Sequence, residues 1–148
     1  MTQTKEVIQK IIKGEVHDDE ATIQSRANDA SLFEVRPELV AFPQDAEDIK
    51  ALVRYTNEQR AAGDKKISLT ARAAGTDMSG GPLGDSIILD TVTHLNRVLE
   101  VHPEVPGGVG GYAVTEPGVF YRDFDAETKK RNLEMPGYPA SRNIATVG

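Results

Sequence analysis

A strand, a helix and a second strand follow one another between residues 38 and 70, and this order most restricts the fold. The stretch ELVAF, residues 38–42, is short and apolar and predicts the first strand. Asp45 then offers an N-cap for a helix that runs to Ala62. The stretch KISLT, residues 66–70, predicts the second strand. Two strands joined by one helix favour parallel pairing through a right-handed crossover, so we expect a βαβ unit.

The rest of the chain predicts further helices and strands on both sides of this unit. The expected elements are helices over 3–13, 18–28 and 120–132 and strands over 86–90, 97–102 and 112–118. The apolar face of the helix between the paired strands is expected to hold Ile49, Leu52, Val53 and Thr56. Asp18 or Asp19 caps the second helix, and the last two strands should form an antiparallel hairpin. The fold class is therefore α+β, with a small parallel unit that leads into a mostly antiparallel part.

The loop after the second strand of the unit has almost no bulky side chains. It reads ARAAGTDMSGGPLG, residues 71–84, and holds four glycines. Glycines let backbone N–H groups approach a ligand without a Cβ in the way, and such a nest of amides binds anions, phosphate above all. The loop lacks the lysine and hydroxyl residue of the P-loop, since Gly81 and Pro82 stand in their places, and it lacks the spacing of the dinucleotide fingerprint. A phosphate-binding loop and a plain glycine-rich connection both remain open at this point.

Composition and spacing narrow the classes of partner and of site. A net charge of −6 and a pI near 5.1 argue against nucleic acid as a partner. Cysteine is absent and the three histidines form no metal motif, so no metal site is predicted. Ser79 and Ser141 lack the surroundings of a catalytic nucleophile. Arg72 is expected either to approach a bound diphosphate or to pair with a carboxylate, and both alternatives stay open. No transmembrane segment is expected, and we predict a cytoplasmic location.

Four stretches, in this order, resemble the FAD-linked oxidase family. They are ELVAFPQDAEDIKALVRYTNEQ, ISLTARAAGTDMSGGPLGDSIILDTVTHLNRVLEV, YAVTEPGVFYRDFD and MPGYPASRNIATVG, and the resemblance covers residues 29–148. Members have the flavin-binding fold of vanillyl-alcohol oxidase and p-cresol methylhydroxylase, and the chain looks most like D-lactate and glycolate dehydrogenases. The resemblance implies a parallel subdomain followed by part of an antiparallel one. It also implies FAD as cofactor and a D-2-hydroxy acid as the small-molecule substrate of the full enzyme.

The resemblance also assigns cofactor-binding residues. In the family the diphosphate lies on the backbone of the glycine-rich loop. The stretch that matches residues 138–141 runs beside the flavin, and Ala145, Thr146 and Gly148 match the start of the family's ATVGG turn. The residues that match these positions are Ala73, Ala74, Gly75, Thr76, Asp77, Ser79, Gly80, Gly81, Tyr138, Pro139, Ala140, Ser141, Ala145, Thr146 and Gly148. Some relatives bind FAD covalently through a histidine of this loop. Thr76 stands at that place here, which implies non-covalent FAD.

The chain is expected to be the N-terminal part of a longer enzyme, because it ends within an apolar, strand-like segment. We divide it into an N-terminal helical arm, residues 1–35, and the first part of an FAD-binding domain, residues 36–148. Catalytic residues, substrate and electron acceptor are expected to depend on parts outside this chain, and the parent enzyme could associate peripherally with a membrane. The piece alone should be inactive and should self-associate, with its last residues either poorly docked or paired in a non-native way. The alternatives are a non-catalytic nucleotide- or anion-binding module and an inert fragment.

Overall fold

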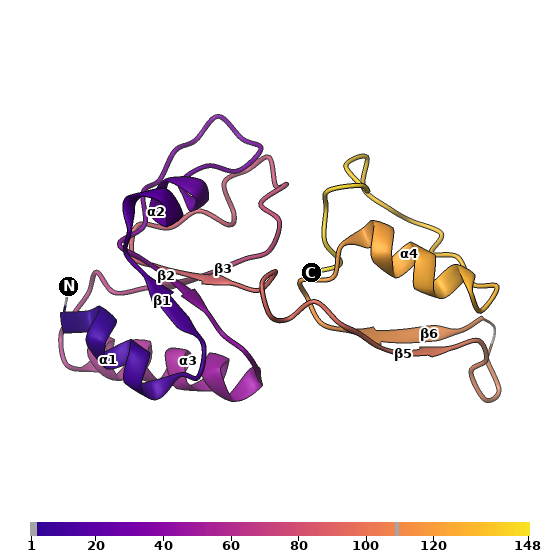
Figure 1. Cartoon of the computed structure of the whole chain (residues 1–148), viewed down its shortest axis with the longest axis horizontal. Helices are drawn as coiled ribbons and strands as arrows, with labels where there is room; N and C mark the ends of the chain where they lie inside the picture. The colour runs from indigo at the N-terminus through magenta and orange to yellow at the C-terminus, as the bar shows by residue number, and fades with distance from the viewer. Residues whose placement is uncertain (1–2, 109) are drawn as a thin grey trace.

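The computed structural model describes residues 3–108 and 110–148, which form two lobes (Figure 1). Met1 and Thr2, the first residues of the expected arm, lie outside the described residues, as does Val109. The elements of the first lobe are α1 (Gln3–Ile11), β1 (Glu15–His17), α2 (Glu20–Arg26), β2 (Leu39–Phe42), α3 (Ala46–Ala61), β3 (Leu69–Arg72) and β4 (Ile87–Asp90). Those of the second lobe are β5 (Val98–His102), β6 (Tyr112–Thr115) and α4 (Tyr121–Lys129).

The first lobe is a four-stranded sheet with the strand order β1-β2-β4-β3. β2 and β3 both run parallel to β4, whereas β1 pairs antiparallel with β2. The prediction of a parallel sheet is confirmed, but the expected direct pairing of β2 with β3 is wrong because β4 lies between them. Sequence order alone does not reveal such an insertion, since both strands are parallel neighbours of the same third strand.

Helices cover both faces of this sheet, with α1 and α3 on one side and α2 on the other (Figure 1). Leu39, Ala41 and Ile87 point into the core with α1 and α3, whereas Val40 and Ile88 contact Ile23 of α2. Alternate residues of each strand therefore bury on opposite faces. Strands covered on both faces are apolar along their whole length, which explains the runs LVAF and SIILD.

Most expected helices and strands are confirmed, with small shifts in their bounds. Asp45 caps α3 by accepting hydrogen bonds from Glu47 N and Asp48 N at 2.9 and 3.1 Å. β3 begins three residues later than predicted, at Leu69. Val53 was expected on the buried face of α3 but is 45% exposed, because the core-facing stripe runs through Leu52 and Thr56.

Strand β1 was missed, since residues 1–35 were expected to hold helices only. It is three residues long and lies next to Gly14. A Cβ at Gly14 would lie 1.9 Å from the carbonyl oxygen of Phe42, so only glycine allows this close approach to β2. The division of the chain into an arm and a domain stays a prediction.

The second lobe is the predicted antiparallel hairpin of β5 and β6, covered by α4 (Figure 1). Val119, Tyr121 and Phe124 form its core with Val98 and Ala113. The end of the chain docks beside this lobe: Gly148 N donates to Pro117 O at 2.9 Å and Val147 N to Val119 O at 2.8 Å. The expectation of a poorly docked end is therefore wrong, because these backbone bonds pair it with the residues that precede α4.

Candidate functional site

The candidate site lies where the parallel strands end. The loop over residues 73–86 leaves β3 at its carboxyl end, and the chain leaves β4 at the same edge of the sheet on its way to the second lobe (Figure 1). In open parallel sheets this edge is where ligands bind. The predicted site residues outside this loop come from residues 138–148 on the second lobe.

Two adjoining hollows gather most of the predicted site residues. The first has a volume of about 470 Å³ and is lined by Ala73–Asp77 from the loop and by Pro139, Ser141, Ala145, Thr146 and Gly148 from the chain end. The second has a volume of about 780 Å³, shares part of this lining, and adds Ser79 and Ala140. Both segments therefore face each other across the hollows. Gly80, Gly81 and Tyr138 are the predicted residues that line neither one.

The two halves of the loop use their backbone N–H groups differently. The carboxylate of Asp77 accepts hydrogen bonds from Ser79 N at 3.1 Å and Gly81 N at 2.8 Å, and the carboxylate of Asp29 accepts one from Gly80 N at 3.1 Å. In contrast, within the described part of the chain, no hydrogen bond is recorded from the N–H groups of residues 74–77. Donors that remain available to a ligand are therefore concentrated in the first half of the loop.

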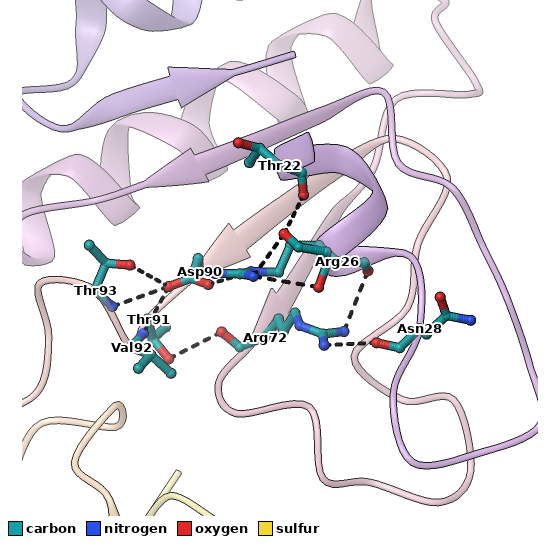
Figure 2. A network of polar contacts seen from close by, with 9 residues as sticks. Thr22, Arg26, Asn28, Arg72, Asp90, Thr91, Val92 and Thr93 are labelled. Carbon is teal, nitrogen blue, oxygen red and sulfur yellow. Dashed lines mark hydrogen bonds and ion pairs between the residues drawn. The ribbon is translucent and has the colours of Figure 1, made fainter. Parts of the chain in front are cut away.

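Gly75 shapes this first half. Its φ of +70° lies in the region that side chains avoid, and a Cβ there would lie 2.2 Å from Nη2 of Arg72. Arg72 is 7% exposed and donates to the backbone carbonyls of Asn28 at 2.8 Å and Arg26 at 3.4 Å (Figure 2). Among the described residues Arg72 thus donates to backbone carbonyls rather than pairing with a carboxylate. Its approach to a bound diphosphate stays a prediction, and Arg72 lines both hollows.

A second arginine joins the same network. Arg26 Nε donates to Asp90 Oδ2 at 2.9 Å, and the other oxygen of this buried carboxylate accepts from Val92 N and from Thr93 (Figure 2). Burial lowers the pKa of Arg72, and the nearby charge of Arg26 lowers it further. The network links α2 to the carboxyl ends of β3 and β4, directly behind the loop.

Hydrogen bonds lower the pKa of Asp77 in the loop and of Asp29, which contacts the loop. The N–H of Gly81 and the hydroxyl of Ser79 lower the pKa of Asp77, and hydrogen bonds from Ser31 and then Gly80 lower that of Asp29. A carboxyl whose pKa is lowered by folding stabilises the folded loop fully above its unfolded pKa, 3.8. This contribution disappears as the pH falls through the lower folded value.

We therefore expect the Gly81 amide proton to titrate with the Asp77 carboxyl. Its NMR chemical shift, followed from pH 6 downward, should change with an apparent midpoint below 3.8. The amide of Gly107 lies in another turn and serves as the control. A midpoint at or above 3.8 for Gly81 would show that the hydrogen bond to Asp77 does not favour the ionised carboxyl.

The described residues show neither a metal site nor a membrane-spanning helix, and their histidines lie away from the hollows. Over 3–108 and 110–148, no three His, Asp or Glu side chains come together in a group that could hold a metal ion. None of the helices described combines the length and apolarity needed to cross a bilayer. His17, His94 and His102 each pair with a nearby carboxylate, and none of them lines either hollow.

Comparison with known proteins decides the family. The sequence model of the FAD binding domain family matches residues 37–148. This chain belongs to the FAD binding domain family. The predicted family and its cofactor, FAD, are thereby confirmed. The match begins just before β2, so the FAD binding domain model leaves out α1, β1 and α2.

Two relatives and one solved structure extend this finding. D-2-hydroxyglutarate dehydrogenase of Pseudomonas putida is 29% identical over 136 residues, which make up 92% of this chain and 13% of that protein. Glycolate oxidase subunit GlcD of Escherichia coli is 27% identical over 90% of this chain and 25% of its own length. A crystal structure of p-cresol methylhydroxylase matches 98% of this chain and 28% of its own chain, with a TM-score of 0.71 at 20% identity. The α+β fold of this type is confirmed, and the chain spans only a small part of each relative.

The residues present fit the diphosphate of FAD. Successive residues whose N–H groups have no recorded acceptor within the described part of the chain line a hollow, and one of them is a glycine with positive φ. Thr76 and Ser141 add hydroxyl donors to the lining. Asn28–Ala30 line the second hollow but were not predicted as site residues from the sequence, because their contact with the loop depends on tertiary structure. Their one local signal was the Asn-Asp pair, typical of turns that bond to the backbone.

Proposed function

We propose that this chain holds the diphosphate of FAD in a flavin-dependent oxidoreductase that acts on a D-2-hydroxy acid. The observation that carries the proposal is that Ala74–Asp77, whose N–H groups have no recorded acceptor in the described residues, line a hollow together with residues of the stretch 139–148. D-2-hydroxyglutarate and glycolate, which appear in the relatives' names, are both 2-hydroxy acids. This agreement supports the substrate class.

Each part of the site would have a separate task. The N–H groups of Ala74–Asp77 and the hydroxyl of Thr76 would bind the diphosphate, and Pro139–Ser141 with Ala145–Gly148 would orient the flavin ring. The roles of Gly80, Gly81 and Tyr138 stay predictions. Bound FAD supplies the acceptor for the hydride that leaves the substrate α-carbon. The cytoplasmic location and the absence of a nucleic-acid partner also stay predictions.

We propose that the chain self-associates, because one edge of strand β6 has no neighbouring strand among the described residues. Among the described residues, β6 pairs with β5 alone, so its other edge presents backbone groups to the solvent or to another chain. Such an edge favours pairing between chains. Light scattering of the 148-residue chain would test this part of the proposal independently of FAD.

Non-covalent FAD is the testable consequence of the residues that line the site. The lining holds no histidine, and the chain has no cysteine, so the usual attachment groups for flavin are absent from it. Acid precipitation of the full-length natural protein that contains this sequence should therefore release all flavin into the supernatant. Flavin that stays with the precipitated protein would contradict the proposal.

Titration with FAD tests the function itself. The same protein, stripped of flavin, should bind FAD with a one-to-one stoichiometry and quench its fluorescence. A protein that binds ADP and FAD equally well but catalyses no oxidation of a 2-hydroxy acid would instead be a non-catalytic nucleotide-binding module. A protein that binds neither would refute the proposed function altogether.

A further inference from the structure

The connection between α2 and β2 packs against the glycine-rich loop, although it precedes the residues matched by the FAD binding domain family. This connection, residues 27–38, lies beside the loop in the first lobe (Figure 1). No function has been assigned to it by the family match, which starts at residue 37. The family match therefore does not explain the contacts of this connection with the loop.

Arg72 forms the first link between the two segments. It lies at the end of β3, and its guanidinium reaches back to the carbonyls of Arg26 and Asn28, where α2 ends (Figure 2). Helix C-terminal carbonyls carry partial negative charge and favour a cation. Because Gly75 lies directly against this guanidinium, the position of Arg72 defines where the loop backbone runs.

Asp29 and Ala30 form the second link. The Asp29 carboxylate accepts from Ser31 N at 2.8 Å on one oxygen and from Gly80 N at 3.1 Å on the other. Ala30 N donates to the carbonyl of Asp77 at 3.0 Å. The connection thus binds the loop at both sides of Met78, which is itself 80% exposed.

We propose that Asp29 and Arg72 are positioning residues that hold the loop in the form in which residues 74–77 turn their N–H groups to the hollow. This inference rests on the proposed function, because it assigns these residues a role in binding the FAD diphosphate. Neither side chain is required to touch FAD. Arg72 fixes the start of the loop, and Asp29 fixes the loop at Gly80.

The charge of Asp29 makes the proposal testable by the sign of the effect. A carboxylate beside a diphosphate repels it, so removing the charge alone would strengthen FAD binding. Loss of a positioning contact would weaken binding. The two effects of one substitution are therefore opposite, and the measured direction shows which role Asp29 has.

The experiment compares Asp29→Ala with Asp29→Asn and with a matched control, Glu34→Ala. Glu34 is an exposed carboxylate of the same connection, and its recorded side-chain contact is with Gln24 rather than with the loop. We expect Asp29→Ala to weaken FAD binding about tenfold, the effect of losing one hydrogen bond to a charged group. Asp29→Asn keeps one acceptor oxygen without the charge and should restore most of the affinity. Glu34→Ala should bind FAD as the unmodified protein does.

Amide hydrogen exchange in the flavin-free protein gives a readout that does not involve FAD. The Gly80 amide should exchange faster in Asp29→Ala and at the original rate in Glu34→Ala, while circular dichroism confirms that both variants are folded. Faster Gly80 exchange with unchanged or tighter FAD binding would overturn the positioning role and leave the proposed function standing. Absence of FAD binding in the unmodified protein would instead refute the proposed function, and the inference with it.

Discussion

Replacing Asp48 by alanine is expected to lower the free energy of unfolding by about 3 kcal/mol, because buried N–H groups lose their acceptor. Asp48 is 2% exposed and lies in the first turn of α3. Its carboxylate accepts from Lys13 N at 2.9 Å, Gly14 N at 3.0 Å and Gln44 N at 2.9 Å. One side chain thus joins the segment between α1 and β1 to the start of α3.

Chemical denaturation measures this effect, and Glu47→Ala is the matched control. Glu47 is the neighbouring residue in the same helical turn, but its side chain is exposed and pairs only with Lys50 in the described structure. Its replacement should change the free energy of unfolding by less than about 0.5 kcal/mol. If Asp48→Ala and Glu47→Ala have equal effects, the three hydrogen bonds are not a major source of stability.

Replacing Gly75 by valine should reduce FAD affinity at least ~100-fold while the fold is kept, since the loop lies at the edge of the sheet and outside the core. The new Cβ would lie 2.2 Å from Nη2 and 2.6 Å from Cζ of Arg72. Either the guanidinium or the loop must move, and a β-branched residue is also strained at a φ of +70°. Fluorescence titration with FAD, beside a thermal unfolding curve, measures both properties.

Gly107→Val separates backbone strain from the local collision. Gly107 has a φ of +73°, nearly that of Gly75, but within the described part of the chain no heavy atom lies within 4 Å of its Cβ position. Its turn joins β5 and β6 and does not line the hollows. The control should lose some stability and keep its FAD affinity. Equal loss of affinity in both variants would show that general destabilisation, rather than the loop, is responsible.

The elements that sequence could predict are those with a local cause. Asp45 caps α3 through its own turn, and the apolar runs of β2 and β4 follow from burial on both faces. β1 could not be predicted in this way, because three residues carry too little pattern and its pairing depends on the space left by Gly14. The order of β4 between β2 and β3 likewise depends on how the whole sheet assembles.

The candidate site likewise has parts with a local cause, which the sequence could predict, and parts that depend on the folded chain. The glycines of the loop are visible in the sequence, since a bare backbone is a local property. The resemblance added the segment over residues 138–148, which no spacing rule would have joined to the loop. The acceptors of Arg72 and of the Gly80 amide could not be foreseen, because they lie 44 and 51 residues away in the sequence. Contacts of that range are a property of the folded chain.

We expect the joint between the two lobes to set the width of the proposed FAD site. One wall of the first hollow belongs to the loop after β3 and the other to the chain end beside α4. The lobes meet at Gly118, whose N–H donates to Leu95 O at 2.7 Å and whose absent side chain leaves room for the carbonyl of Thr91. We therefore expect a cofactor that contacts both walls to stabilise the one angle between the lobes at which both contacts form.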